Sequence, residues 1–166
     1  MGKDASGTDA ETPAEAGNPE VWFYHLERQR LEDVLPNLLD KTRQRGWRAV
    51  VQTGSEERRD ALNDLLWTFS EASFLAHGTA HDGSSEMQPI YLTCVPENPN
   101  GAEVQFLVDE ADADDPAGYA RSIFLFDGHD EQAVADARTA WKSARDAGCD
   151  VTYWQQSVQG KWEKKT

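Results

Sequence analysis

The amino-acid sequence predicts an α/β fold with a mixed, mainly parallel sheet and helices on both of its faces. Short apolar runs alternate with longer segments in which apolar residues recur every three or four positions, and the first four segments follow the order strand, helix, strand, helix. Strands that are joined through a helix lie parallel in one sheet. The chain has 166 residues, which suits one domain with a substantial core rather than two.

The first half of the chain supplies two predicted strands and two predicted helices. The strands are compact apolar runs, and the first helix carries leucines and a valine along one face and ends at Gly46. The second helix has Ser55 as a candidate N-cap, followed by Glu56 and Glu57 in its first turn, where the helix dipole favours carboxylates. In chain order these elements are strand 21–26, helix 31–46, strand 47–53 and helix 55–68.

The second half adds four predicted strands and one predicted helix. The turn between the first two of these strands contains Asn100-Gly101, a pair that favours a β-hairpin. The charged end of the chain, residues 160–166, is expected to be solvated. In chain order the segments are a polar loop 77–88, strands 89–94, 103–109 and 119–128, helix 130–147 and strand 150–156. All these elements together predict a single Rossmann-like three-layer domain over residues 21–166.

Residues 1–20 differ in composition from the rest of the chain. They are rich in Ala, Gly, Pro, Ser, Thr and acidic residues and contain no Val, Ile, Leu, Phe, Tyr or Trp, so we expect a disordered acidic tail. The segment lacks the basic start and apolar run of a signal peptide, and no later run of about 18 apolar residues predicts a membrane span. Cys94 and Cys149 form no CxxC pair, which indicates reduced thiols and a cytoplasmic protein.

The overall charge argues against direct DNA binding, and the sequence lacks the common motifs of nucleotide-binding and hydrolytic enzymes. The chain has 30 acidic and 16 basic residues, a formal net charge of -14, so contact with DNA is expected only through a partner. It contains no GxGxxG after a strand, no GxxxxGK[ST] and no GxSxG, and no cofactor is expected. His77 and His81 flank a glycine-containing loop without a third ligand at zinc spacing, and the acidic run 109–115 lacks the glycine and glutamate of an EF-hand, so no metal site is predicted.

The residues of the predicted helix 130–147, described below, suggest a peptide-binding role, and two alternatives to that role stay open. A Rossmann-like hydrolase or nucleotide-binding enzyme would use the loop His77–Gln88 and would have a deep polar pocket with a titratable group of perturbed pKa at a strand's C-terminal end. A plain structural component would instead make contact only through an aromatic surface at Trp67 and Phe74, which lie with Phe69 at the end of the second helix and in the loop that follows. Those aromatic side chains either pack beneath the helix end or form a partner surface.

The last predicted helix carries a short row of cations in this acidic chain. Arg138, Lys142 and Arg145, here called the basic stripe, follow at spacings of four and three residues, with Trp141 among them. Four alanines form the helix face toward the sheet, namely Ala133, Ala137, Ala140 and Ala144. Val134 and Trp141 lie at one edge of that face, and the stripe lies next to this edge. Such long side chains either cover the core margin and pair with acidic neighbours, or bind a ligand that has both acidic and apolar groups, such as an acidic peptide.

Several segments, in this order and spacing, resemble the chi subunit family of bacterial DNA polymerase III. The resemblance covers about residues 21–166 and rests on "FYHL", "GWRAVVQTGSEERRDALNDLLWTFSEASFLAHG", "QPIYLT", "ENPNGAEVQFLVD", "LFDGHDE", "AWK" and "TYWQQSVQGKWEKK". It implies an adaptor in the clamp-loader complex without catalytic activity of its own. One surface would bind the acidic C-terminal tail of single-stranded DNA-binding protein, and another would bind the psi subunit or an equivalent clamp-loader component.

The resemblance also implies which residues form these two surfaces. Arg138, Trp141 and Lys142 match the family's Arg, aromatic and Lys pattern on the last helix, with Trp in place of a Tyr that the family also uses. The end of the preceding strand lines the same pocket. The expected tail site therefore comprises six residues, namely Phe126, Gly128, Val134, Arg138, Trp141 and Lys142. The expected psi surface comprises Trp67 and Phe74.

Overall fold

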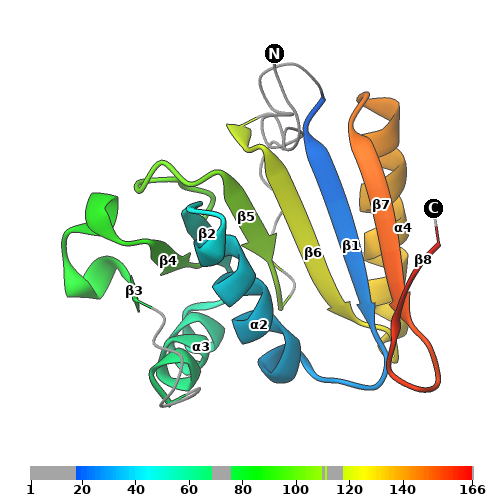
Figure 1. Ribbon diagram of the computed structural model, residues 1–166, viewed down its shortest axis with the longest axis horizontal. Coiled ribbons are helices and arrows are strands. Elements are labelled where there is room, and N and C mark those ends of the chain that lie inside the picture. The colour runs from blue at the N-terminus through cyan, green and yellow to red at the C-terminus, as the bar shows by residue number, and fades with distance from the viewer. Residues whose placement is uncertain (1–17, 69–75, 110, 112–117, 166) are drawn as a thin grey trace.

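A computed structural model describes residues 18–68, 76–109, 111 and 118–165, and in these residues eight strands and three α-helices form the fold (Figure 1). The expected disordered tail and the candidates Phe69 and Phe74 lie outside the described residues. The strands are β1 (Glu20–Leu26), β2 (Ala49–Gln52), β3 (His77–Gly78), β4 (Ile90–Thr93), β5 (Val104–Leu107), β6 (Arg121–Asp127), β7 (Asp150–Gln156) and β8 (Trp162–Lys164). The helices are α2 (Leu31–Gln44), α3 (Glu56–Thr68) and α4 (Glu131–Asp146), and two 3₁₀ turns are η2 (Ala80–Asp82) and η3 (Ser85–Met87).

The strands form one sheet in the order β3-β4-β2-β5-β6-β1-β7-β8. All neighbouring pairs are parallel except β7 and β8, which are antiparallel. Helices α2 and α3 cover one face, and α4 covers the other (Figure 1). The predicted fold class, a mixed and mainly parallel sheet between helical layers, is confirmed.

The side chains on the two faces of the interior strand β1 belong to different cores. Because side chains alternate along a strand, Tyr24 and Leu26 lie in the larger core under α2 and α3, whereas Val21 and Phe23 lie in the smaller core under α4. Two residues of the predicted tail site, Phe126 and Trp141, pack against the smaller core. In α3, the Ser55 hydroxyl accepts a hydrogen bond from the Arg58 N–H at 3.2 Å, as the predicted N-cap requires.

The predicted hairpin at Asn100-Gly101 is wrong. Strands β4 and β5 lie on opposite edges of β2 and are parallel to it, so the chain between them crosses over instead of turning back. The Asn100 side chain is buried and donates to the carbonyls of Ala49 and Gln88 at 3.2 and 2.8 Å. Its amide therefore fixes the crossover to the start of β2, and the positive φ of +65° at Gly101 serves that turn.

The expectation of a solvated C-terminal end is partly wrong. Residues Trp162–Lys164 form β8 against β7, and the ring of Trp162 lies 4.9 Å from that of Tyr24. The charged side chains beside it, Glu163 and Lys165, are exposed as expected. One aromatic side chain that packs on the core is enough to order a segment whose other residues are charged. The polar loop 77–88 likewise contains the two-residue strand β3.

Candidate functional site

Helix α4 lies close to the sheet because its inner face is made of alanine. Asp130 caps the helix, its carboxylate accepting from the Gln132 and Ala133 N–H groups at 3.0 and 3.2 Å. Ala137 and Ala144 are buried in the smaller core, and Ala140 packs at its margin, as the alanine spacing predicts. The small side chains bring the helix backbone near the aromatic residues of β1, β6 and β7.

The basic stripe borders this core and faces solvent. Arg138 and Lys142 are exposed, and Trp141 is half-buried against the smaller core. Among the described residues, no carboxylate lies within ion-pair distance of Arg138 or Lys142, whereas Arg145 approaches Asp146 at 3.7 Å. The Arg145 guanidinium also lies over the Trp141 ring, 4.6 Å from its centroid. Pairing with acidic neighbours therefore accounts for Arg145 only.

Three aromatic rings from three strands lie beside the stripe. The Phe126 ring is 5.1 Å from that of His25 and 6.1 Å from that of Tyr153, and all three lie on the α4 side of the sheet. Burial is the largest influence on two of them and lowers the pKa of His25 but raises that of Tyr153. The positive charge of Arg138 reinforces the first shift and opposes the second. The structure thus places a cation near a cluster of aromatic rings on the α4 side of the sheet.

Hydrogen bonds hold the His25 ring in one orientation. Its Nδ1 lies 2.8 Å from the Tyr153 hydroxyl, and its Nε2 lies 3.0 Å from a carboxylate oxygen of Glu27. Because a carboxylate only accepts, Nε2 carries the proton of the neutral ring and Nδ1 accepts from Tyr153. Sequence reasoning missed His25 and Tyr153 as site residues. The alternation along Val21–Leu26 is the signal that places His25 on the same side as Phe23.

Gly128 is required by the close approach of the His25 ring. A Cβ at this position would lie 2.2 Å from two ring atoms of His25 and 2.8 Å from the Leu26 carbonyl oxygen. The Gly128 N–H donates to that same carbonyl at 2.7 Å. The resemblance named Gly128 as a pocket residue, and in the structure its missing side chain makes room for His25.

The remaining predicted site residues lie apart from this cluster. Val134 is half-buried one helical turn before Arg138, and it is not among the residues that pack in the smaller core. Trp67, at the end of α3, is 56% exposed, and its ring centroid is 4.6 Å from that of His77. Because α3 and α4 cover opposite faces of the sheet, the expected tail and psi surfaces belong to different layers.

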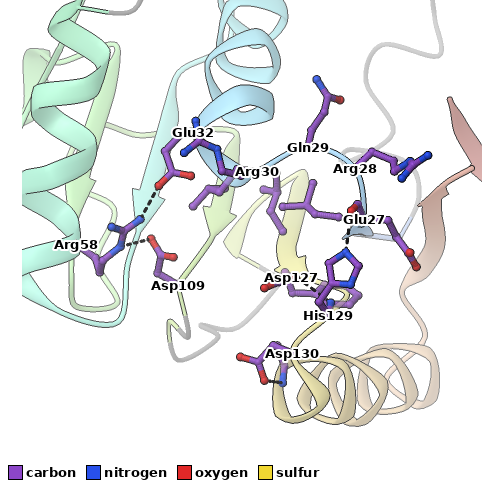
Figure 2. Close-up of a pocket in the computed structure, with 15 residues that line it drawn as sticks. Glu27, Arg28, Gln29, Arg30, Glu32, Arg58, Asp109, Asp127, His129 and Asp130 are labelled. Carbon is purple, nitrogen blue, oxygen red and sulfur yellow. Dashed lines mark hydrogen bonds and ion pairs between the residues drawn. The ribbon is translucent and has the colours of Figure 1, made fainter. Parts of the chain in front are cut away.

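A crevice opens where the connections of β1 and β6 leave the sheet on opposite faces (Figure 2). Its volume is about 460 Å³, and it lies at the carboxyl ends of the two strands, the usual ligand position in such sheets. Three of its charged side chains, however, pair with one another. Arg58 bonds Asp109 at 2.9 Å and Glu32 at 3.3 Å, and the bond to Asp109 chiefly raises the pKa of Arg58.

The loop His77–Gln88, on which the enzyme alternative depends, has structural contacts. His77 Nε2 lies 3.2 Å from the Asn63 carbonyl oxygen, and His81 Nε2 lies 3.2 Å from the Arg59 guanidinium. Three cavities of about 460 to 520 Å³ are lined by other described residues and include no residue of this loop. In the same part of the chain, no three His, Cys, Asp or Glu side chains are grouped to hold a metal ion, and no helix has the length and apolarity of a membrane span.

Comparison with known proteins connects these features to a family. Residues 19–152 match the family model described as DNA polymerase III chi subunit, HolC. The chain belongs to this family. A protein of Rickettsia prowazekii (strain Madrid E) named "Probable DNA polymerase III subunit chi" is 30% identical over 90 residues, which is 54% of either chain. The matched part thus spans about half the length of that relative. The chi family match includes α4 and the whole basic stripe, and it leaves out residues 1–18 and β8.

The stability of this chi family member is expected to fall below pH 6.5. Burial lowers the pKa of His25 from 6.5, Glu27 opposes the shift, and His129 and Arg138 reinforce it. The folded state therefore favours the neutral ring, and unfolding takes up a proton between the two pKa values. The stabilisation is complete above pH 6.5 and is lost as the pH falls toward the lowered pKa. Urea unfolding of wild type and His25→Gln over this pH range measures it, because titratable groups that do not interact with His25 cancel in the difference. Identical pH dependence of the two proteins would contradict the prediction.

Proposed function

We propose that the protein is an accessory, chi-type subunit of the DNA polymerase III clamp-loader complex and acts in the cytoplasm as an adaptor without catalysis of its own. Its ligand is the acidic C-terminal tail of single-stranded DNA-binding protein. The observation that carries the proposal is the pair Arg138 and Lys142, two exposed cations one helical turn apart that have no carboxylate partner among the described residues. Family membership supports the same role.

The chemistry of the site suits a peptide that combines carboxylates with an apolar end. The two cations attract carboxylates, while the half-buried ring of Trp141 and the neighbouring Phe126 offer apolar surface to a terminal side chain. The net charge of -14 keeps the rest of the molecule from binding DNA directly. Because the charged contacts are exposed, we expect micromolar affinity, about -8 kcal/mol, that weakens as salt rises.

The second partner in this proposal is the psi subunit or an equivalent clamp-loader component. The exposed ring of Trp67 supports this surface, since a large exposed aromatic side chain is typical of an interface. It lies on the layer opposite α4, so both partners have room to bind at once.

Fluorescence anisotropy with a labelled peptide that copies the tail of the same organism's single-stranded DNA-binding protein tests the proposal. Arg138→Ala and Lys142→Ala are each expected to weaken binding roughly fivefold at low salt, since an exposed charge contact contributes about 1 kcal/mol. Lys41→Ala, which removes an exposed cation from α2 on the opposite layer, is the matched control, and Trp67→Ala is the control for the psi surface. Both controls should bind like wild type. Absent binding, or equal loss in Lys41→Ala, would contradict the proposed site.

A further inference from the structure

The proposed function leaves the acidic residues before the domain without a role. Residues 1–17 carry four carboxylates and one lysine, and they precede the family match, which begins at residue 19. A segment of this charge is repelled by most of a molecule with 30 acidic and 16 basic residues. The part of the molecule that attracts it must be a local excess of cations.

The basic stripe is such an excess. Arg138 and Lys142 have no carboxylate partner among the described residues, and the exposed Arg145 lies 3.7 Å from Asp146 and over the Trp141 ring. Arg58, by contrast, is paired with both Glu32 and Asp109. The stripe thus offers up to three positive charges in one row to an acidic segment.

The described chain begins beside the C-terminal end of the helix that carries this stripe. The Pro19 carbonyl accepts from the Asp150 N–H at 2.9 Å, and Asp150 follows the last residue of α4, Asp146, by four positions. In Figure 1, β1 begins at the same end of the sheet as the one where α4 ends. Residues 1–17 are therefore joined to the domain beside the C-terminal end of α4.

The length of the segment is sufficient to cover the stripe. Arg138 lies eight residues before Asp146, which corresponds to about 12 Å along the helix. A chain of 17 residues spans at most about 60 Å. Asp4, Asp9 and Glu11 lie at least eight residues before Pro19 and thus have enough chain to reach the whole stripe, whereas Glu15, four residues before Pro19, spans at most about 14 Å and reaches toward Arg145.

We propose that residues 1–17 dock through their carboxylates on the basic stripe of the same chain and compete there with an acidic peptide. The competition rests on the proposed function, whereas the docking does not. The segment contains no aromatic residue, so it satisfies the cations but leaves the apolar surface at Trp141 uncovered. A ligand that has both carboxylates and an apolar end displaces it, and an acidic molecule without such an end does so less well.

The test uses the full chain with its four carboxylates neutralised as Asp4→Asn, Asp9→Asn, Glu11→Gln and Glu15→Gln. The matched control keeps the charge and changes four alanines, as Ala5→Ser, Ala10→Ser, Ala14→Ser and Ala16→Ser. Without any peptide, amide NMR shifts over residues 138–145 should change in the neutralised chain, and high salt should produce the same change in wild type. In anisotropy, the neutralised chain should bind the tail peptide about three- to tenfold more tightly. This is the gain expected if the segment occupies the stripe in about two thirds to nine tenths of the wild-type molecules.

Each outcome decides between the two proposals. Unchanged shifts on α4, or changes confined to another basic region such as residues 161–165, would overturn docking on the stripe. Shifts that grow with protein concentration would assign the segment to a second molecule and overturn docking within one chain. Equal peptide affinity of neutralised chain and control would overturn the competition. Changed shifts on α4 with no peptide binding to any chain would support the docking and refute the proposed function instead.

Discussion

Phe23→Ala is expected to lower the free energy of unfolding by about 3–5 kcal/mol, because it empties the centre of the smaller core. Phe23 is fully buried on strand β1, which has a parallel neighbour on each side. Its ring stacks on Phe124 at a centroid distance of 4.8 Å and on Tyr153 at 6.1 Å. Truncation removes these contacts and leaves a cavity beneath α4, because the backbones of the parallel strands cannot close over it. Urea denaturation followed by tryptophan fluorescence measures the loss.

Two companion variants make the Phe23 measurement interpretable. Val158→Ala shortens a side chain that is 73% exposed and should change stability by no more than about 0.5 kcal/mol. Phe23→Leu keeps an apolar side chain of intermediate size and should lie between wild type and Phe23→Ala. A loss below about 1 kcal/mol in Phe23→Ala would show that α4 does not pack on this strand as described.

Gly128→Ala is expected to cost about 1–3 kcal/mol and to displace the His25 ring. The added Cβ would come within 2.2 Å of that ring, which cannot easily move because Tyr153 and Glu27 hold its two nitrogens. The second contact, 2.8 Å to the Leu26 carbonyl oxygen, is with backbone and is equally hard to relieve. Thermal unfolding reports the cost, and the NMR signals of the His25 ring report its displacement.

Gly118→Ala is the matched control for this prediction. A Cβ at Gly118 meets nothing within 4 Å, and its φ lies outside the left-handed region. It should therefore change stability little. If Gly128→Ala unfolds like this control and leaves the His25 signals in place, the close packing between β6 and the ring of β1 is refuted.

Sequence patterns predicted most of the fold because most of its elements are defined locally. Apolar periodicity and caps located all three helices, and the alanine spacing on α4 identified its buried face. Strand neighbours depend instead on contacts between distant residues. The pair Asn100-Gly101 is compatible with a hairpin, and only the bonds of Asn100 to Ala49 and Gln88 show that the chain crosses β2. The strand β8 was missed because its single packing residue, Trp162, is surrounded by charged residues.

In the candidate site, too, the residues that lie close together in the sequence could be predicted, whereas those brought together by the fold could not. Arg138, Trp141 and Lys142 are neighbours on one helix, so their spacing and a family resemblance were enough to select them. His25 and Tyr153 are 128 residues apart, and a hydrogen bond that their strands make possible brings them together. The sequence could not show either whether these cations form ion pairs, since carboxylates of other elements could pair with them. That Arg138 and Lys142 have no carboxylate partner in the described residues follows only from the three-dimensional arrangement.

The two ends of the sheet have a consequence for association between molecules. An unpaired strand edge is a template on which another chain can add a strand, and long flat edges promote aggregation. Here the outermost strands, β3 with two residues and β8 with three, offer little backbone for such pairing. The exposed charges of Glu163 and Lys164 on β8 add electrostatic repulsion and a cost of desolvation. The short antiparallel strand β8 therefore covers the part of the β7 edge at Trp154–Gln156, which would otherwise be open to a neighbouring molecule.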